Sequence, residues 1–90
     1  MNVSTYKHEN SERAKEQIGA LPTKKIKDQI EGAVLRLAKH PDLGKCLKGE
    51  LSGLWTYRTG NYRIIYKLFR SELRILVVAL GDRRDVYREI

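Results

Sequence analysis

Three β-rich runs separated by short turns constrain the fold of this chain more than any other feature of the sequence. The runs read LWTYRT, NYRIIYKLF and LRILVVAL, and they fall within residues 54–80. Branched and aromatic residues bounded by Gly, Asn and Ser are typical of β-strands. Because turns this short join antiparallel neighbours, the sequence predicts a three-stranded antiparallel meander.

Side chains alternate between the two faces of a strand, so the composition of each face can be predicted. One face collects the apolar and aromatic side chains Trp55, Tyr57, Tyr62, Ile64, Tyr66 and Leu68. The other face collects the cations Arg58, Arg63 and Lys67. We therefore expect the aromatic face to be the core and the opposite face to be an open, basic surface.

The first half of the chain predicts a short strand and two helices. The strand is expected over residues 2–7, and the first helix follows in NSERAKEQIGAL, with Asn10 or Ser11 as its cap. The second helix is expected from Pro22 to His40, because apolar residues recur there at helical spacing: Ile26, Ile30, Ala33, Val34 and Leu37. The link between the helices is so short that they should form an antiparallel hairpin.

These elements predict an α+β fold, with the N-terminal helical hairpin packed on one face of a small, mainly antiparallel β-sheet. The chain has 90 residues, which fits one domain over residues 1–90. Its longest apolar run, Ile75–Leu80, is too short to span a bilayer, and the N-terminus is too polar for a signal peptide. The lone Cys46 cannot form an internal disulfide, so a cytoplasmic location without membrane contact is expected.

Eighteen Lys and Arg residues against eleven Asp and Glu residues give the chain a formal net charge of +7. An excess of this size favours an acidic or polyanionic partner, although many small proteins are basic for solubility alone. The C-terminal segment GDRRDVYREI adds Arg83, Arg84, Tyr87 and Arg88. If this segment folds over the basic face, it completes a basic groove that contains one phenol.

Two candidate site residues also have a purely structural interpretation. Arg63 could extend its guanidinium to solvent from the strand, or it could present a planar fork to a phosphate. Tyr87 could anchor the terminus in the core, or it could be a general base, because nearby cations favour the phenolate. His8 and His40 are expected as surface or capping residues. The acidic residues show no paired spacing for a metal ion, so neither a metal nor another cofactor is expected.

The segments PDLGKCLKG, YRTGNYRIIY and GDRRDVY, in this order and at this chain length, resemble the RelE/ParE toxin superfamily of bacterial and archaeal toxin–antitoxin modules. The family fold is a small antiparallel sheet with a helical hairpin on one face. The resemblance implies a type II toxin that is a metal-independent endoribonuclease and cuts messenger RNA, usually in the ribosomal A site. In such enzymes the ribose 2′-hydroxyl attacks the adjacent phosphate. It also implies an acidic, RelB-like antitoxin that is partly disordered and folds over the basic face on binding.

By this resemblance, Arg63 would stabilise the charged phosphate, Arg83 would act near the leaving oxygen, and Tyr87 would be the general base. RNA binding would fall to Lys48, Arg58, Lys67, Arg84 and Arg88. The chain departs from the best-known RelE proteins at Leu54 and Thr56, where those proteins carry lysines. Without those lysines, cleavage would be slower, or another cation, such as Lys48 or Lys67, would compensate for the missing charge.

Two other functions stay open. ParE-like toxins share the fold and the hairpin arginines, but they inhibit DNA gyrase by binding and cleave no RNA. A basic RNA-binding module without catalysis would need neither Tyr87 nor any other proton-transfer group. The combination of Arg83 with Tyr87 favours the ribonuclease branch over the ParE branch.

Overall fold

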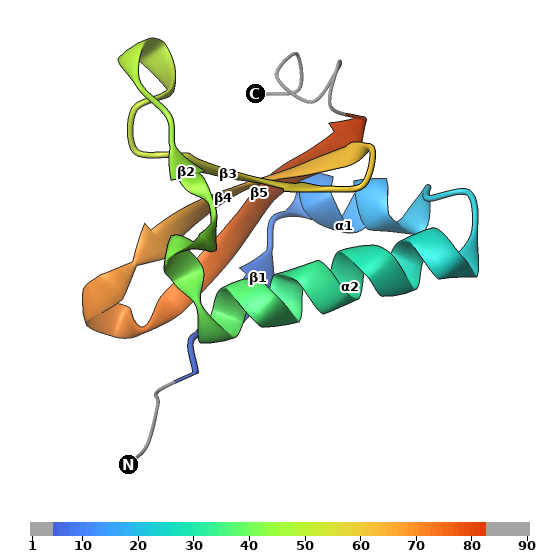
Figure 1. The fold of residues 1–90 in the computed structure, drawn as a ribbon, viewed down its shortest axis with the longest axis horizontal. Helices are drawn as coiled ribbons and strands as arrows, with labels where there is room; N and C mark the ends of the chain where they lie inside the picture. Colours follow the sequence, from blue (N-terminus) through green and yellow to red (C-terminus); the bar gives the residue numbers. More distant parts are fainter. Residues whose placement is uncertain (1–4, 83–90) are drawn as a thin grey trace.

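Five strands form one sheet, and two helices cover one of its faces in the computed structural model, which describes residues 5–82 (Figure 1). The strands are β1 (Lys7–Asn10), β2 (Lys45–Cys46), β3 (Trp55–Thr59), β4 (Tyr62–Phe69) and β5 (Arg74–Asp82), and the helices are α1 (Glu12–Gly19) and α2 (Lys24–Lys39). The strand order is β1-β5-β4-β3-β2, with β1 parallel to β5 and every other pair antiparallel. The expected α+β fold is confirmed.

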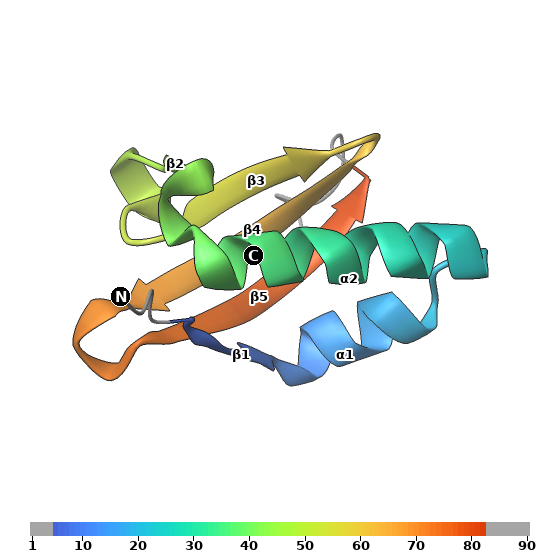
Figure 2. The same ribbon diagram turned by 60° about the horizontal axis from the view of Figure 1, so that its bottom comes forward.

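The two helices run antiparallel along the sheet and are joined by a short loop (Figure 2). Both begin at a side-chain cap. The Ser11 hydroxyl accepts a hydrogen bond from the Ala14 N–H at 3.0 Å, and the Thr23 hydroxyl accepts one from the Ile26 N–H at 3.1 Å. Such caps satisfy backbone donors that the helix itself leaves unpaired. Because Thr23 is the cap, α2 begins at Lys24 and not at the expected Pro22.

The first strand lies at Lys7–Asn10, so its expected position over residues 2–7 was wrong; residues 1–4 lie outside the described range. Pairing with β5 fixes the true position, because Lys7 lies opposite Arg74 and Asn10 lies opposite Val77. The Ser11 hydroxyl also donates a 2.7 Å hydrogen bond to the Val78 carbonyl. The strand therefore runs directly into the cap of α1.

The core lies between the helices and the sheet face that alternation predicted. The apolar stripe of α2 supplies buried Ile30, Ala33, Val34 and Leu37, and the sheet supplies Ile64, Tyr66, Ile75, Val77 and Leu80. Trp55, Tyr57, Tyr62 and Leu68 pack against this cluster and are partly exposed. In β5 the pairing skips Val78, since Ile65 lies opposite Ala79 and Tyr66 lies opposite Val77. This bulge keeps both Val77 and Leu80 on the core face.

The β3–β4 hairpin is held against α2 at its tip. Gly60 has a φ of 60° and occupies the first central position of the turn, where a type II′ turn requires glycine. The Gln29 side-chain amide donates a 3.0 Å hydrogen bond to the Thr59 carbonyl. This contact fixes the end of the hairpin that carries Arg58 and Arg63. Within residues 5–82, no helix is both long and apolar enough to cross a membrane.

Candidate anion-binding site on the open face

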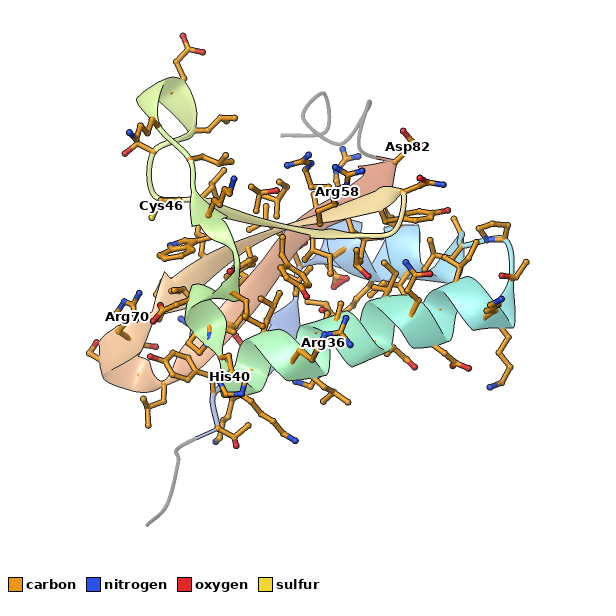
Figure 3. The ribbon with its side chains drawn as sticks, in the orientation of Figure 1. Arg36, His40, Cys46, Arg58, Arg70 and Asp82 are labelled. Atoms are coloured by element: carbon orange, nitrogen blue, oxygen red, sulfur yellow. The ribbon has the colours of Figure 1, made fainter. Side chains whose placement is uncertain are left out.

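Two arginines lie side by side on the sheet face that points away from the helices. Arg58 of β3 and Arg63 of β4 are direct cross-strand partners, and Arg63 lies opposite Gly81 of β5. Figure 3 shows Arg58 on the far side of the sheet from α2, near the end of β5 at Asp82. Arg58 is exposed, whereas Arg63 is partly buried. Like charges directly opposite each other destabilise a sheet, so this pair suits a site that receives an anion.

A pocket of about 320 Å³ adjoins the two arginines. Its lining includes three cations, Lys45, Arg58 and Arg63, together with Thr56. No acidic side chain of the described residues lines it. A concave surface lined by cations of one sign focuses the electrostatic potential and concentrates anions. The pocket can therefore bind a phosphate, a carboxylate or another compact anion.

A row of cross-strand partners runs from the pocket across the sheet. Lys45 lies opposite Thr56, Thr56 opposite Ile65, and Ile65 opposite Ala79. Thr56 is 5% exposed, and Ile65 and Ala79 are fully buried although they lie on the face away from the helices. The face is therefore less open than alternation suggested. Buried apolar side chains therefore lie beside the cations of the pocket lining, which lowers the local dielectric and strengthens charge interactions there.

Tyr66 pins the segment that carries Lys45 to the sheet. Its hydroxyl donates to the Pro41 carbonyl at 2.9 Å and accepts from the Gly44 N–H at 3.1 Å. Burial raises the pKa of the Tyr66 phenol to about 12, so it stays neutral and can make both bonds. Residue 44 must be glycine, because a Cβ there would overlap both the Tyr66 hydroxyl and the Thr56 carbonyl. This close approach places β2 directly beside β3.

The expected site residues divide into three groups. Arg58 and Arg63 come together at the pocket. Lys48 lies before the short turn Gly49–Leu51, and Lys67 lies four residues beyond Arg63 on the same face; both are exposed, and neither lines the pocket. The other expected site residues lie outside the described range: Arg83, Arg84, Tyr87 and Arg88.

Sequence reasoning missed Lys45 and gave Thr56 no role. Lys45 belongs to a strand of two residues, which is too short to show a periodic pattern. The one available signal in the sequence was Gly44, the residue before Lys45. A glycine beside a strand can mark a place where two backbone segments approach so closely that no side chain fits. The sequence drew attention to Thr56 only as a position where the best-known RelE proteins carry a lysine.

Comparison with protein families and curated proteins places the chain among toxins of type II toxin–antitoxin systems. Residues 9–87 match the family described as ParE toxin of type II toxin–antitoxin system, parDE. The curated protein Toxin RelG from Mycobacterium tuberculosis is 29% identical over 76 residues, which are 83% of this chain and 87% of that protein.

Solved structures give the same result for the fold. The toxin–antitoxin complex RelBE2 from Mycobacterium tuberculosis contains a chain that superposes with a TM-score of 0.79 at 25% identity, over 88% of this chain and 99% of that one. The isolated RelE toxin from E. coli superposes with a TM-score of 0.72 at 19% identity, over 93% of each chain. The similarity in fold therefore extends over most of the chain.

Proposed function

Because this chain belongs to the RelE/ParE superfamily of toxins from type II toxin–antitoxin systems, we propose that it is a metal-independent endoribonuclease that cleaves messenger RNA at the ribosome. The observation that carries this proposal is the arginine pair, Arg58 and Arg63, at the rim of a pocket whose described lining has no acidic side chain. A phosphodiester is the anion that such a pocket would meet on RNA. Guanidinium groups bind phosphate oxygens through two parallel hydrogen bonds.

The proposed reaction needs three charge movements. The ribose 2′-hydroxyl loses its proton and attacks the adjacent phosphorus, the P–O5′ bond breaks, and the 5′-oxygen gains a proton. The products are a 2′,3′-cyclic phosphate and a 5′-hydroxyl. Arg63 would stabilise the extra negative charge on the phosphate, because donors in a partly desolvated site act most strongly where charge develops.

Two residues outside the described range complete the proposed mechanism. Tyr87 would take the proton of the 2′-hydroxyl, and Arg83 would stabilise the leaving 5′-oxygen or donate a proton toward it. Both roles rest on the resemblance of GDRRDVY to the superfamily. On the described pocket lining, Tyr57 is the one side chain besides the cations that could exchange a proton, and it packs against the core cluster.

We propose an acidic, RelB-like antitoxin as the protein partner. Two observations support it: the net charge of +7, and the similarity to a toxin that was solved together with its antitoxin. Binding across Arg58 and Arg63 would place antitoxin carboxylates where the RNA phosphate would otherwise lie. The toxin would act in the cytoplasm, where messenger RNA and ribosomes are found.

Inhibition of DNA gyrase is the second candidate function, and the match to the ParE family favours it. In that case Arg58 and Arg63 would contact gyrase, and no proton transfer would be needed. The first candidate function predicts cleavage of messenger RNA, and the second predicts that messenger RNA stays intact.

The deciding experiment runs two assays on the same purified protein. One measures cleavage of a messenger RNA in the A site of purified ribosomes, and the other measures DNA supercoiling by purified gyrase. We expect new 5′ ends on the messenger RNA and unchanged supercoiling. Intact messenger RNA together with inhibited supercoiling would assign the chain to the second function.

A further inference from the structure

Thr56 is a buried polar residue of β3 on the sheet face that carries the pocket. It is 5% exposed, and within residues 5–82 its hydroxyl oxygen has no hydrogen-bond partner. Most buried polar side-chain atoms in folded proteins have at least one partner, so an exception needs an explanation. Valine has nearly the same shape and a higher strand preference, and it would serve packing without this unpaired hydroxyl.

Thr56 belongs to the lining of the pocket that the arginines border, and its hydroxyl oxygen is buried there. Thr56 lines the pocket, and Arg58 follows two residues later on the same face. Lys45 lies directly opposite Thr56 on the neighbouring strand and also lines the pocket. Four hydrogen-bond donors from three strands therefore surround one cavity: Lys45, Thr56, Arg58 and Arg63.

The size and chemistry of the pocket fit one phosphate with its adjoining sugar. Its volume of about 320 Å³ lies at the lower end of the range for small-ligand sites, about 300–1,000 Å³. Each donor group that lines it can bind an anionic oxygen, and a threonine hydroxyl can rotate to donate. A phosphate oxygen in the pocket would satisfy the buried hydroxyl.

We propose that the Thr56 hydroxyl donates a hydrogen bond to a backbone phosphate of single-stranded RNA, and that the Lys45 ammonium group binds the same phosphate from β2. This inference rests on the proposed function and adds two RNA-contacting residues to Arg58 and Arg63. Lys45 thereby supplies, from the neighbouring strand, a positive charge that the chain lacks at Leu54 and Thr56. Gly44 and Tyr66 hold Lys45 in place for this contact.

The test measures RNA affinity and folding stability of the same variants. The probe is a single-stranded RNA oligonucleotide with 2′-O-methyl groups at every position, which keeps its phosphates but cannot be cleaved by 2′-attack. Thr56→Val should weaken binding about tenfold or more, because a hydrogen bond to a charged group is lost. Its melting temperature should equal or exceed that of the wild type, since the free protein loses only an unpaired hydroxyl. Thr56→Ser should retain binding.

Lys45→Met is the independent second variant. It keeps the length of the side chain and removes its charge, so binding should weaken and the slope of log affinity against log salt should fall by about 0.7, the value for one phosphate contact on a single strand. The matched control is Lys25→Met, because Lys25 is an exposed lysine in the first turn of α2. This control should leave both affinity and salt slope unchanged.

The outcomes separate this inference from the proposed function. Wild-type affinity in both Thr56→Val and Lys45→Met would overturn the inference, and so would a wild-type protein that does not bind the oligonucleotide. Ribosomal messenger RNA cleavage by the wild type is scored separately. Weakened binding in both variants, with no cleavage by the wild type, would support the phosphate site and contradict the endoribonuclease. If Thr56→Val does not fold, Lys45→Met alone decides.

Discussion

Arg63 is partly buried in the middle of β4, where a strand usually carries a branched or aromatic residue. Its neighbours explain how a cation is accommodated there. Gly81 of β5 leaves space on one side, and the pocket opens on the other. Arg58 and Arg63 could be predicted from the sequence, because a hairpin with a two-residue turn fixes register and face together. Lys45 and Thr56 could not, since their roles depend on how β2 docks against β3.

Tyr66 allows a prediction about pH. Its pKa of about 12 lies above the ordinary value of 10.0, so the native state holds the phenol proton more tightly than the unfolded state does. Stability from this group is complete below pH 10 and is lost as the pH rises from 10 to 12, by about 1.4 kcal/mol per pH unit.

Tyr66→Phe should be less stable than the wild type at pH 8 by about 1–3 kcal/mol, because the Gly44 N–H and the Pro41 carbonyl lose their partner. This difference in unfolding free energy should shrink as the pH approaches 12. Only the wild type carries the Tyr66 phenol, and its deprotonation favours the unfolded state. Urea unfolding of both proteins at pH 8, 10 and 11.5 measures it. A difference that stays constant over this range would contradict a raised pKa for Tyr66.

Tyr87→Phe tests the proposed general base. The change keeps the ring and removes the ionisable oxygen, so cleavage should fall about 10²–10⁴-fold while RNA affinity stays the same. Single-turnover cleavage on purified ribosomes, paired with a binding measurement, separates the two effects. Full cleavage by the variant would remove Tyr87 from the mechanism.

At the scale of elements, α2 organises both the core and the site. Its buried stripe packs on the sheet, and Gln29 on the same helix holds the hairpin tip at Thr59. The stripe and the meander were predictable, because helical and strand periodicities differ clearly in long segments. The position of β1 and the existence of β2 were not. The strand β1 has four residues and β2 has two, so neither shows a periodic pattern, and each is defined by backbone pairing with another strand.

Ile30→Ala tests the core that α2 provides. Ile30 is fully buried, so the variant should lose about 2–5 kcal/mol of unfolding free energy through lost contacts and the cavity left behind. Leu35→Ala is the matched control on the same helix, because Leu35 is 55% exposed. Chemical denaturation of the two variants gives the comparison. Equal losses would mean that the stripe of α2 does not form the core.

At the scale of the whole molecule, an excess of positive charge and a concave basic face predict how the toxin meets its partners. Charged surfaces accelerate association, and ions screen this effect beyond about 8–10 Å at physiological salt. The association rate with the cognate antitoxin should therefore fall steeply as salt rises, while the dissociation rate changes little. Stopped-flow mixing at two or three ionic strengths measures it. An association rate that ignores ionic strength would contradict antitoxin binding at the basic face.

Arg63 and Arg36 offer a charge-matched comparison for the central claim that the open face of the sheet is an RNA-cleaving site. Both variants to alanine remove one positive charge, but Arg36 is exposed on α2, on the other side of the sheet (Figure 3). Arg63→Lys completes the set, because it keeps the charge and loses the planar fork.

The measurement is single-turnover cleavage of a messenger RNA on purified ribosomes, with a chelator present throughout at a concentration that leaves the ribosomes intact. Arg63→Ala should slow cleavage about 10²–10³-fold, as expected when one donor to the developing charge is lost. Arg36→Ala should cleave at the wild-type rate, and Arg63→Lys should fall between the two. Equal rates for Arg63→Ala and Arg36→Ala would contradict a cleavage site at the arginine pair.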